Sequence, residues 1–239
     1  MASPSKPSKR TKQRRPKPIL TIDLPEDATL AERAYHVIRD RIITLELPPG
    51  ALVREEDLMS DLGMSRTPVR EALLRLSLER LVVMVSRRGT FVSDVNIGEV
   101  GRIYELRRGL EAQAAEWAAR RRRDSDIPDI DALLDELRAI PSHPAKPNID
   151  ARTEIPLDQR AHFLIYRMCG NHFAEDVLKS HFFLSARMWF LAAGHVPMDE
   201  PFDLLVDLFD AIKAGDAEAA RRLAIEHNKH AERTLREAL

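Results

Sequence analysis

The chain has 239 residues, of which 44% are hydrophobic and 31% are charged, and its formal net charge is −1. This composition supports a folded core, and no apolar run reaches the roughly 18 residues that a membrane-spanning helix needs. The single cysteine, Cys169, excludes an internal disulfide framework. Because the N-terminus lacks the apolar core of a secretory signal, we expect a cytoplasmic protein.

Charge is divided unevenly along the chain. Residues 1–95 carry 17 Lys and Arg against 13 Asp and Glu, whereas residues 96–239 carry 20 against 25. This division favours a DNA-binding front module joined to a module that does not bind DNA. Residues 1–28 are expected to form a disordered basic arm, since residues 1–18 are rich in Lys, Arg and Pro and contain no acid. The arm either adds non-specific attraction for phosphate or is a passive tail.

Two helices are predicted near the start of the folded part. Apolar residues at helical spacing predict a first helix over residues 29–45, with Thr29 as its N-cap in a capping box. The Pro-Pro-Gly sequence at residues 48–50 turns the chain. A second helix fits residues 55–62, and Gly63 can adopt the left-handed conformation that ends it.

A third helix and a hairpin follow. Ser65 is the expected N-cap of a helix that runs to about residue 79, and three leucines are expected to face inward: Leu73, Leu74 and Leu76. Residues 81–85 and 90–93 are rich in β-branched and apolar residues and are predicted to pair through a glycine-containing turn. The order helix, helix, helix, hairpin is that of a winged helix-turn-helix, which we place at residues 29–95.

The N-terminal turn of the third helix carries the strongest functional signal. Arg66 and Arg70 lie one turn apart, and arginine can bind guanine through two hydrogen bonds in the major groove. Ser65 and Thr67 can donate hydrogen bonds to phosphate. The alternative is a surface helix whose arginines are solvated or paired with nearby acids. At the tip of the hairpin, Arg87 and Arg88 could enter the minor groove or contact phosphate.

Residues 96–239 are predicted to be wholly helical. A long helix begins near Asn96 and a shorter one covers residues 126–140, before a proline-rich loop at residues 141–152. Further helices are expected over residues 154–169, 172–193 and 200–214, and a last one starts after Asp216. The expected fold is therefore mainly α, with a winged helix-turn-helix that contains a small β-hairpin, followed by an all-α bundle of six to seven helices.

Residues 30–93 resemble the N-terminal domain of the GntR family of bacterial transcription regulators. The resemblance is carried by Leu-Pro-Pro-Gly at residues 47–50, Ser-Arg-Thr-Pro-Val-Arg-Glu-Ala-Leu at residues 65–73 and Arg-Gly-Thr-Phe-Val at residues 88–92. It implies a homodimer on a short palindromic operator. It also implies that the residues at the start of the third helix contact DNA, and that Arg88 and Gly89 belong to the wing.

The helical remainder is similar to the effector domain, called FCD, of the FadR-type branch of that family. The similarity is carried by five segments: Tyr104 to Arg107 with Glu111, Asp158 to His162, Gly170 with Asn171, Ala211 to Asp216, and His227. It implies a domain at residues 96–239 that binds an effector and dimerises. The implied effector is a small organic acid, which would shift the dimer between geometries that can and cannot span both half-sites.

A divalent metal site is a further expectation. Asp158 and His162 lie four residues apart on one helix, so they can share a cation. The resemblance adds His227 and a fourth ligand at a position that Leu205 occupies here. Three ligands can still hold Zn²⁺, Ni²⁺ or Mn²⁺, with water or an effector carboxylate completing the site. The alternative is a hydrogen-bonded Asp158–His162 pair without metal.

Two effector contacts are expected in the bundle. Arg107 lies beside an apolar stripe and could bind a carboxylate through two hydrogen bonds, or it could simply pair with Glu111 four residues later. Trp189 either contacts the effector or belongs to the core. The sequence thus predicts a ligand-responsive transcription regulator, not an enzyme. The alternatives are a metal-dependent hydrolase that uses Asp158, His162 and His227, and an architectural DNA-binding protein without a ligand.

Overall fold

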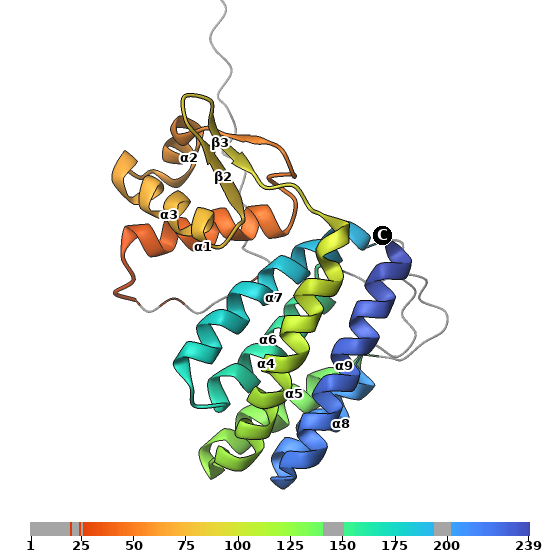
Figure 1. Cartoon of the computed structure of the whole chain (residues 1–239). Coiled ribbons are helices and arrows are strands. Elements are labelled where there is room, and N and C mark those ends of the chain that lie inside the picture. The colour runs from red at the N-terminus through yellow and green to blue at the C-terminus, as the bar shows by residue number, and fades with distance from the viewer. Residues whose placement is uncertain (1–19, 21–23, 25, 141–150, 194–201) are drawn as a thin grey trace, which may run out of the picture.

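The computed structural model describes residues 20, 24, 26–140, 151–193 and 202–239. A small domain of three helices and a sheet lies on one end of a larger bundle of helices (Figure 1). The expected basic arm falls almost wholly outside the described residues, as does most of the loop expected at residues 141–152.

The three helices of the small domain lie where the sequence predicts them. α1 (Leu30–Ile43) starts with the expected capping box, in which Glu32 N donates to Thr29 Oγ1 (3.2 Å) and Thr29 N donates to the Glu32 carboxylate (2.7 Å). α2 (Glu55–Leu62) ends at Gly63, whose φ of +66° is the left-handed conformation expected there. α3 (Arg66–Leu78) follows after a short turn.

The sheet has three strands rather than two. β2 (Val82–Val85) and β3 (Gly89–Val92) form the predicted antiparallel hairpin. The sequence prediction missed β1 (Leu52–Val53), which pairs with the edge of β3 opposite β2 and gives the order β1-β3-β2. A strand of two residues is too short to show an alternating pattern, so only the pairing with β3 defines it.

The core of the small domain forms between α1 and α3. α3 buries a stripe at helical spacing: Val69, Ala72, Leu73 and Leu76. The expectation that Leu74 faces inward is wrong, because its side chain is 56% exposed. Leu74 lies about 100° around the helix from Leu73, which points it away from this stripe.

Six α-helices form the bundle within the part of the chain that the structure describes: α4 (Val100–Arg121), α5 (Ile127–Ala139), α6 (Glu154–Met168), α7 (His172–Ala192), α8 (Asp203–Ala214) and α9 (Ala217–Ala238). α4 is the central helix, packed against α6, α7, α8 and α9. Asn96 caps a short 3₁₀ turn at Ile97–Glu99 that leads into α4, rather than α4 itself. None of the described helices combines the length and apolar character that crossing a membrane requires. The mainly α architecture predicted from the sequence is confirmed.

The two domains contact each other through α1 and α7. Arg39 of α1 is only 1% exposed, and its guanidinium lies 3.9 Å from the centre of the Phe183 ring on α7. Arg187 of α7 donates from Nη2 to the backbone oxygen of Ser93, just after β3 (2.5 Å). A buried cation above an aromatic ring and a charge-assisted hydrogen bond therefore join the domains.

Candidate functional site

The start of α3 presents the four residues that the sequence singles out. Ser65 adopts the extended conformation of an N-cap, but its side chain makes no capping hydrogen bond, so the hydroxyl can donate elsewhere. The side chains of Ser65, Arg66, Thr67 and Arg70 are exposed, whereas Pro68 and Val69 between them are buried. Burial of these two residues fixes the helix on the domain and leaves the other four facing solvent.

Both arginines of this face pair with acids of α2. Arg70 Nε lies 2.9 Å from Glu55 Oε2, and Arg66 Nη2 lies 3.3 Å from Glu56 Oε1. Arg66 and Arg70 nevertheless remain 52% and 60% exposed. Exposed ion pairs of this kind contribute only about 0–1 kcal/mol, so these contacts orient the arginines without tying up all their N–H groups. The sequence analysis gives pairing with nearby acids as the alternative for these arginines, and the structure shows such pairs.

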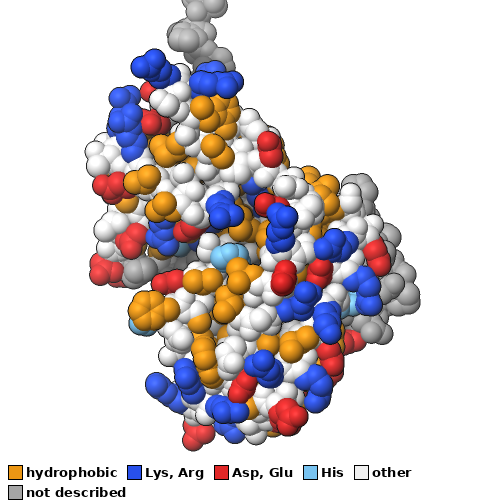
Figure 2. All heavy atoms as spheres, in the orientation of Figure 1, with side chains coloured by type: hydrophobic (Ala, Val, Ile, Leu, Met, Phe, Trp, Pro, Cys, Tyr) orange, Lys and Arg blue, Asp and Glu red, His pale blue; other side chains and the backbone are white. Residues whose placement is uncertain are grey.

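The β2–β3 turn carries the other residues expected at DNA. Arg87 and Arg88 are exposed and make no ion pair with any described residue. Arginine side chains gather at this end of the domain, around the hairpin tip (Figure 2). Gly89 has a φ of +110°, and a Cβ atom there would meet Leu52 Cδ1 at 3.0 Å. The turn therefore requires glycine at this position.

The three predicted metal ligands come together in the bundle. Asp158 and His162 on α6 and His227 on α9 each offer a ligand atom, and these atoms lie within 4.8 Å of one another. His162 Nδ1 lies 2.9 Å from the backbone oxygen of Asp158 and donates to it, which leaves Nε2 as the remaining ring nitrogen. His227 Nε2 is 3.9 Å from Asp158 Oδ1.

The surroundings of these ligands set their charges. Burial and the neighbouring His162 lower the pKa of His227 to about 3, so its imidazole is neutral and can donate a lone pair. Burial raises the pKa of Asp158, although His162 and Arg107 oppose this shift. Burial also disfavours a charged His162, but Asp158 and Glu111 outweigh it and raise the pKa.

Two imidazoles and one carboxylate fit a borderline divalent cation such as Zn²⁺ or Ni²⁺. A cation that binds here must displace the proton of His162, because a ligating imidazole is neutral. Leu205, at the expected fourth position, is fully buried in the core on α8 and can supply no ligand atom. Among the described residues, the candidate donor set therefore consists of three protein groups.

A buried ion pair lies beside this cluster. Arg107 Nε donates to Glu111 Oε1 (2.8 Å), and both residues are on α4 with exposures of 3% and 4%. The same carboxylate accepts from Tyr166 Oη (2.5 Å) and Asn228 Nδ2 (2.6 Å), and it lies 3.4 Å from His162 Nε2. Although burial opposes ionisation, Arg107 and His162 hold the pKa of Glu111 well below its usual range.

Arg107 and Trp189 both have partners within the protein. Arg107 Nη1 donates to Ser185 Oγ on α7, in addition to the pair with Glu111 that the sequence offered as an alternative. Trp189 is half-buried, and its Nε1 donates to Tyr104 Oη (2.8 Å). Removing one member of a buried pair such as Arg107–Glu111 typically costs about 3–5 kcal/mol, so this network is strongly fixed.

Sequence reasoning missed three residues of the network: Tyr166, Ser185 and Asn228. Tyr166 lies four residues after His162, on the same face of α6, and Asn228 follows His227 directly. These two positions are the only local features of the sequence that could have placed Tyr166 and Asn228 in the network. The hydrogen bonds themselves join residues 55 and 117 positions apart in the sequence, so only the packing of α4 against α6 and α9 reveals them.

A winged helix-turn-helix whose third helix begins with exposed Ser65, Arg66, Thr67 and Arg70, joined to a helical bundle with a buried polar cluster, defines a class of two-domain DNA-binding regulators. The sequence profile of bacterial regulatory proteins of the gntR family matches residues 30–92, and the profile of the FCD domain matches residues 102–230. The chain belongs to the GntR family of transcription regulators, in its FadR-type branch with a C-terminal FCD domain.

Individual relatives agree with this assignment. The HTH-type transcriptional repressor RspR of Escherichia coli K12 is 23% identical over 207 residues, covering 86% of this chain and 89% of RspR. An HTH-type regulator from an unstable DNA locus of Streptomyces ambofaciens is 33% identical over 138 residues, covering 57% of this chain. The chain spans about half of that relative's length (55%).

A solved structure of E. coli McbR/YncC superposes with a TM-score of 0.76 at 22% identity, covering 88% of this chain and 98% of that one. This likeness shows the fold. The family is one of regulators and not of enzymes, so the expectation that the chain is not an enzyme is confirmed and the hydrolase alternative is set aside.

Proposed function

We propose that the chain is a ligand-responsive transcription regulator that binds a palindromic operator as a homodimer. In this proposal residues 29–95 bind DNA, and α3 lies in the major groove with its N-terminal turn against the bases. Arg66 and Arg70 read base edges, while Ser65 and Thr67 donate to phosphate. One observation carries the proposal: these four side chains share one exposed face of α3, which buried neighbours fix to the domain.

The wing completes the DNA contact. Arg87 and Arg88 have no ion-pair partner among the described residues and stand at the hairpin tip, where they can neutralise phosphate or enter the minor groove. Gly89 allows the close turn that brings them there. Each phosphate contact of this kind makes binding more sensitive to salt.

The effector site is proposed in the bundle, residues 96–239, which also form the dimer contact. A divalent cation held by Asp158, His162 and His227 supplies a Lewis-acidic position for the carboxylate of a small organic acid. Arg107 reaches the same carboxylate by exchanging its hydrogen bond to Ser185 or Glu111 for the ligand, and Trp189 contacts the ligand's apolar part. Support comes from the clustering of the three ligand groups and from the neutral state of His227.

Ligand binding is proposed to shift the dimer between geometries that can and cannot place both α3 helices in successive major grooves. Since RspR is named as a repressor, repression is the proposed mode of action, in the cytoplasm. The proposal requires that the effector differ in affinity for the two geometries.

The test uses the purified full chain and operator DNA obtained by selection from a random library. A panel of small carboxylates is screened with Zn²⁺ or Ni²⁺ by thermal shift, and each ligand found is added to a fluorescence-anisotropy titration with the operator. We expect a ligand that stabilises the protein to change operator affinity at least about fivefold, the lower end of allosteric coupling. A ligand that stabilises the protein but leaves operator affinity unchanged contradicts the proposed switch.

A further inference from the structure

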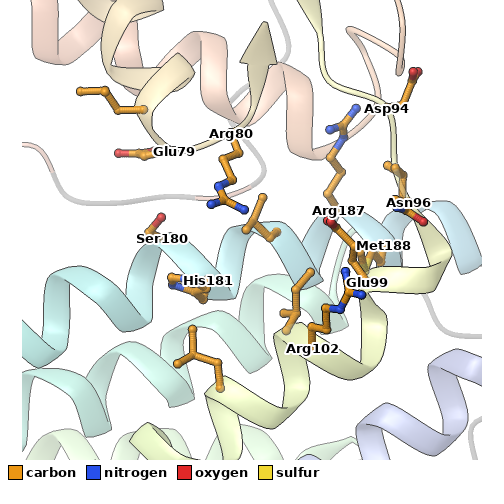
Figure 3. Close-up of a pocket in the computed structure, with 15 residues that line it drawn as sticks. Glu79, Arg80, Asp94, Asn96, Glu99, Arg102, Ser180, His181, Arg187 and Met188 are labelled. Carbon is orange, nitrogen blue, oxygen red and sulfur yellow. The ribbon is translucent and has the colours of Figure 1, made fainter.

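A cleft with a volume of about 420 Å³ lies between the two domains (Figure 3). Its walls are the end of α3, the linker after β3, the start of α4 and one face of α7. This volume falls in the range of small-molecule sites, about 300–1,000 Å³, which occur preferentially at domain interfaces. The cleft shares no residue with the Asp158 cluster or with the Arg107–Glu111 pair.

Two arginines of the cleft are exposed and unpaired. The side chains of Arg80 and Arg102 make no hydrogen bond or ion pair with any residue that the structure describes. In Figure 3, Arg80 extends from the end of α3 towards α7, and Arg102 stands on α4 at the opposite wall. Their N–H groups are free to bind an anion between the domains.

A third arginine is buried and incompletely bonded. Arg187 is 3% exposed, and although its Nη2 donates to the backbone of Ser93, its buried Nε has no partner. Burial lowers the pKa of Arg187 to about 10, with Asp94 opposing the shift, so the side chain stays cationic at neutral pH. A buried guanidinium N–H without an acceptor costs free energy, which an anion in the cleft would recover.

The acids that line the cleft leave Arg80 and Arg102 incompletely balanced. Glu79 already accepts hydrogen bonds from Tyr35 Oη (2.7 Å) and from Arg75 Nε (3.3 Å). Asp94 acts on the buried Arg187. Among the described acids of the cleft, this leaves Glu99, and one carboxylate cannot balance both Arg80 and Arg102. The charged side chains of the cleft that have no partner therefore carry a net positive charge.

Part of the cleft surface is apolar. Ile103, Leu184 and Met188 line it, and Leu78 and Leu106 are 80% and 40% exposed beside them.

We propose that this cleft is a second ligand site for a small organic anion. The acidic head of the anion binds Arg80, Arg102 and Arg187, and its apolar body packs on Ile103, Leu184 and Met188. Carboxylate and phosphate heads share the required chemistry.

Such a ligand would contact both the end of α3 and the helical bundle. Arg80 lies two residues beyond the last residue of α3, in a left-handed conformation (φ +61°) that points it at α7. An anion held by Arg80 on one side and by Arg102 and Arg187 on the other would fix the orientation of α3 relative to α4 and α7. The site thus offers a route from ligand binding to DNA affinity that does not pass through the buried cluster.

The full chain is titrated with three naphthalene probes of nearly equal shape: 2-naphthoate, 2-naphthyl phosphate and the uncharged 2-naphthamide. Binding is followed by probe fluorescence for the wild type, Arg80→Gln and Arg102→Gln. Both arginines are exposed, so the variants are expected to fold. Arg222→Gln is the matched control, because Arg222 is 62% exposed on α9 and lies outside the cleft.

We expect saturable binding of at least one anionic probe, about tenfold weaker in Arg80→Gln and in Arg102→Gln and unchanged in Arg222→Gln. Binding of the phosphate probe alone would assign a phosphate head, and binding of the naphthoate a carboxylate head. The proposal is overturned if neither anionic probe shows saturable binding, or if 2-naphthamide binds as tightly as the anionic probes. It is also overturned if the affinity of the anionic probes is the same in Arg80→Gln, Arg102→Gln and the wild type. The last result would place the ligand elsewhere, such as the buried cluster.

Discussion

Arg70 Nε lies 2.9 Å from Oε2 of Glu55, so the recognition helix α3 holds its second arginine against an acid of the preceding helix. Glu55 also lies 3.6 Å from Arg66 Nε, and its own side chain is only 19% exposed. A single half-buried carboxylate therefore contacts both arginines that we propose as base readers. It can orient them, but in the proposed complex its charge would also face the phosphates that α3 approaches.

Replacing Glu55 separates these two effects. In Glu55→Gln the negative charge is gone, so we expect tighter binding to random DNA, while the less firmly oriented arginines discriminate less well between operator and random sequence. The expected loss of discrimination is up to about 1 kcal/mol, the value of an exposed ion pair. Anisotropy titrations with both kinds of DNA measure the ratio of the affinity for the operator to the affinity for random DNA.

Asp61→Asn is the control for this variant. Asp61 lies on the same helix and also pairs with an arginine, Arg41, which is not one of the proposed readers. An operator-to-random ratio that is equal in Glu55→Gln and the wild type would show that Glu55 plays no part in orienting the readers.

The sequence predicts the elements that rest on local patterns. The capping box at Thr29, the left-handed Gly63 and the exposed start of α3 all follow from short-range rules, and the structure agrees with each. The i,i+4 pair Arg107–Glu111 is also local, and its spacing alone predicts it as one of two alternatives for Arg107.

Contacts between distant segments could not be predicted in this way. β1 is defined only by its pairing with β3, and the hydrogen bonds of Tyr166 and Asn228 to Glu111 depend on how α6 and α9 pack against α4. The pairing of Arg70 with Glu55 likewise needs the angle between α2 and α3. The roles of these residues in binding DNA or an effector remain predictions.

The metal site makes a prediction about stability. Zn²⁺ or Ni²⁺ should raise the midpoint of thermal unfolding, because a cation that binds only the folded protein stabilises it, by about 2.7 kcal/mol at one hundred times Kd. In His227→Gln, which lacks one of the three ligands, we expect most of this metal-dependent gain to disappear. Thermal scans with metal and with EDTA measure the difference within each variant.

His172→Gln serves as the comparison, since His172 is exposed on α7 and lies outside the cluster. If His227→Gln gains as much stability from metal as the wild type does, the cation binds at other groups and the assignment of Asp158, His162 and His227 is wrong.

The lowered pKa of His36 predicts that the stability of the folded protein depends on pH. Burial, together with the charges of Arg39, Arg75 and Lys179, lowers its pKa from about 6.5 to about 4, and the opposite charge of Glu32 compensates only partly. The unfolded chain therefore binds more protons between pH 6.5 and pH 4, and stability falls as the pH falls through this window. His36→Leu should lose less stability over the same window than the wild type.

Urea unfolding at pH 7, 6, 5 and 4 tests this expectation. Other carboxylates titrate in the same range, so the quantity of interest is the difference between the two proteins at each pH. Parallel stability curves for the wild type and His36→Leu would mean that His36 takes up its proton as easily in the folded protein as in the unfolded one.

The N-terminal arm predicts a salt effect. Residues 1–18 carry seven Lys and Arg, and if these bind phosphates, their removal should flatten the dependence of log affinity on log salt by about 0.9 for each phosphate that they neutralise. The effect should be equal for operator and random DNA, because binding to phosphate carries no sequence information. A variant with these seven residues changed to Gln separates charge from chain length. An unaltered slope would identify the arm as a passive tail.

The central claim is that the start of α3 reads DNA sequence, and Arg66→Ala tests it most directly. Sites selected from a random library with the wild type are compared with random DNA in gel-shift titrations, with Arg120→Ala, an exposed arginine of α4, as the control. We predict that Arg66→Ala loses about 1–3 kcal/mol of preference for the selected sites and that Arg120→Ala keeps it. An unchanged preference in Arg66→Ala would contradict the claim that Arg66 reads the operator.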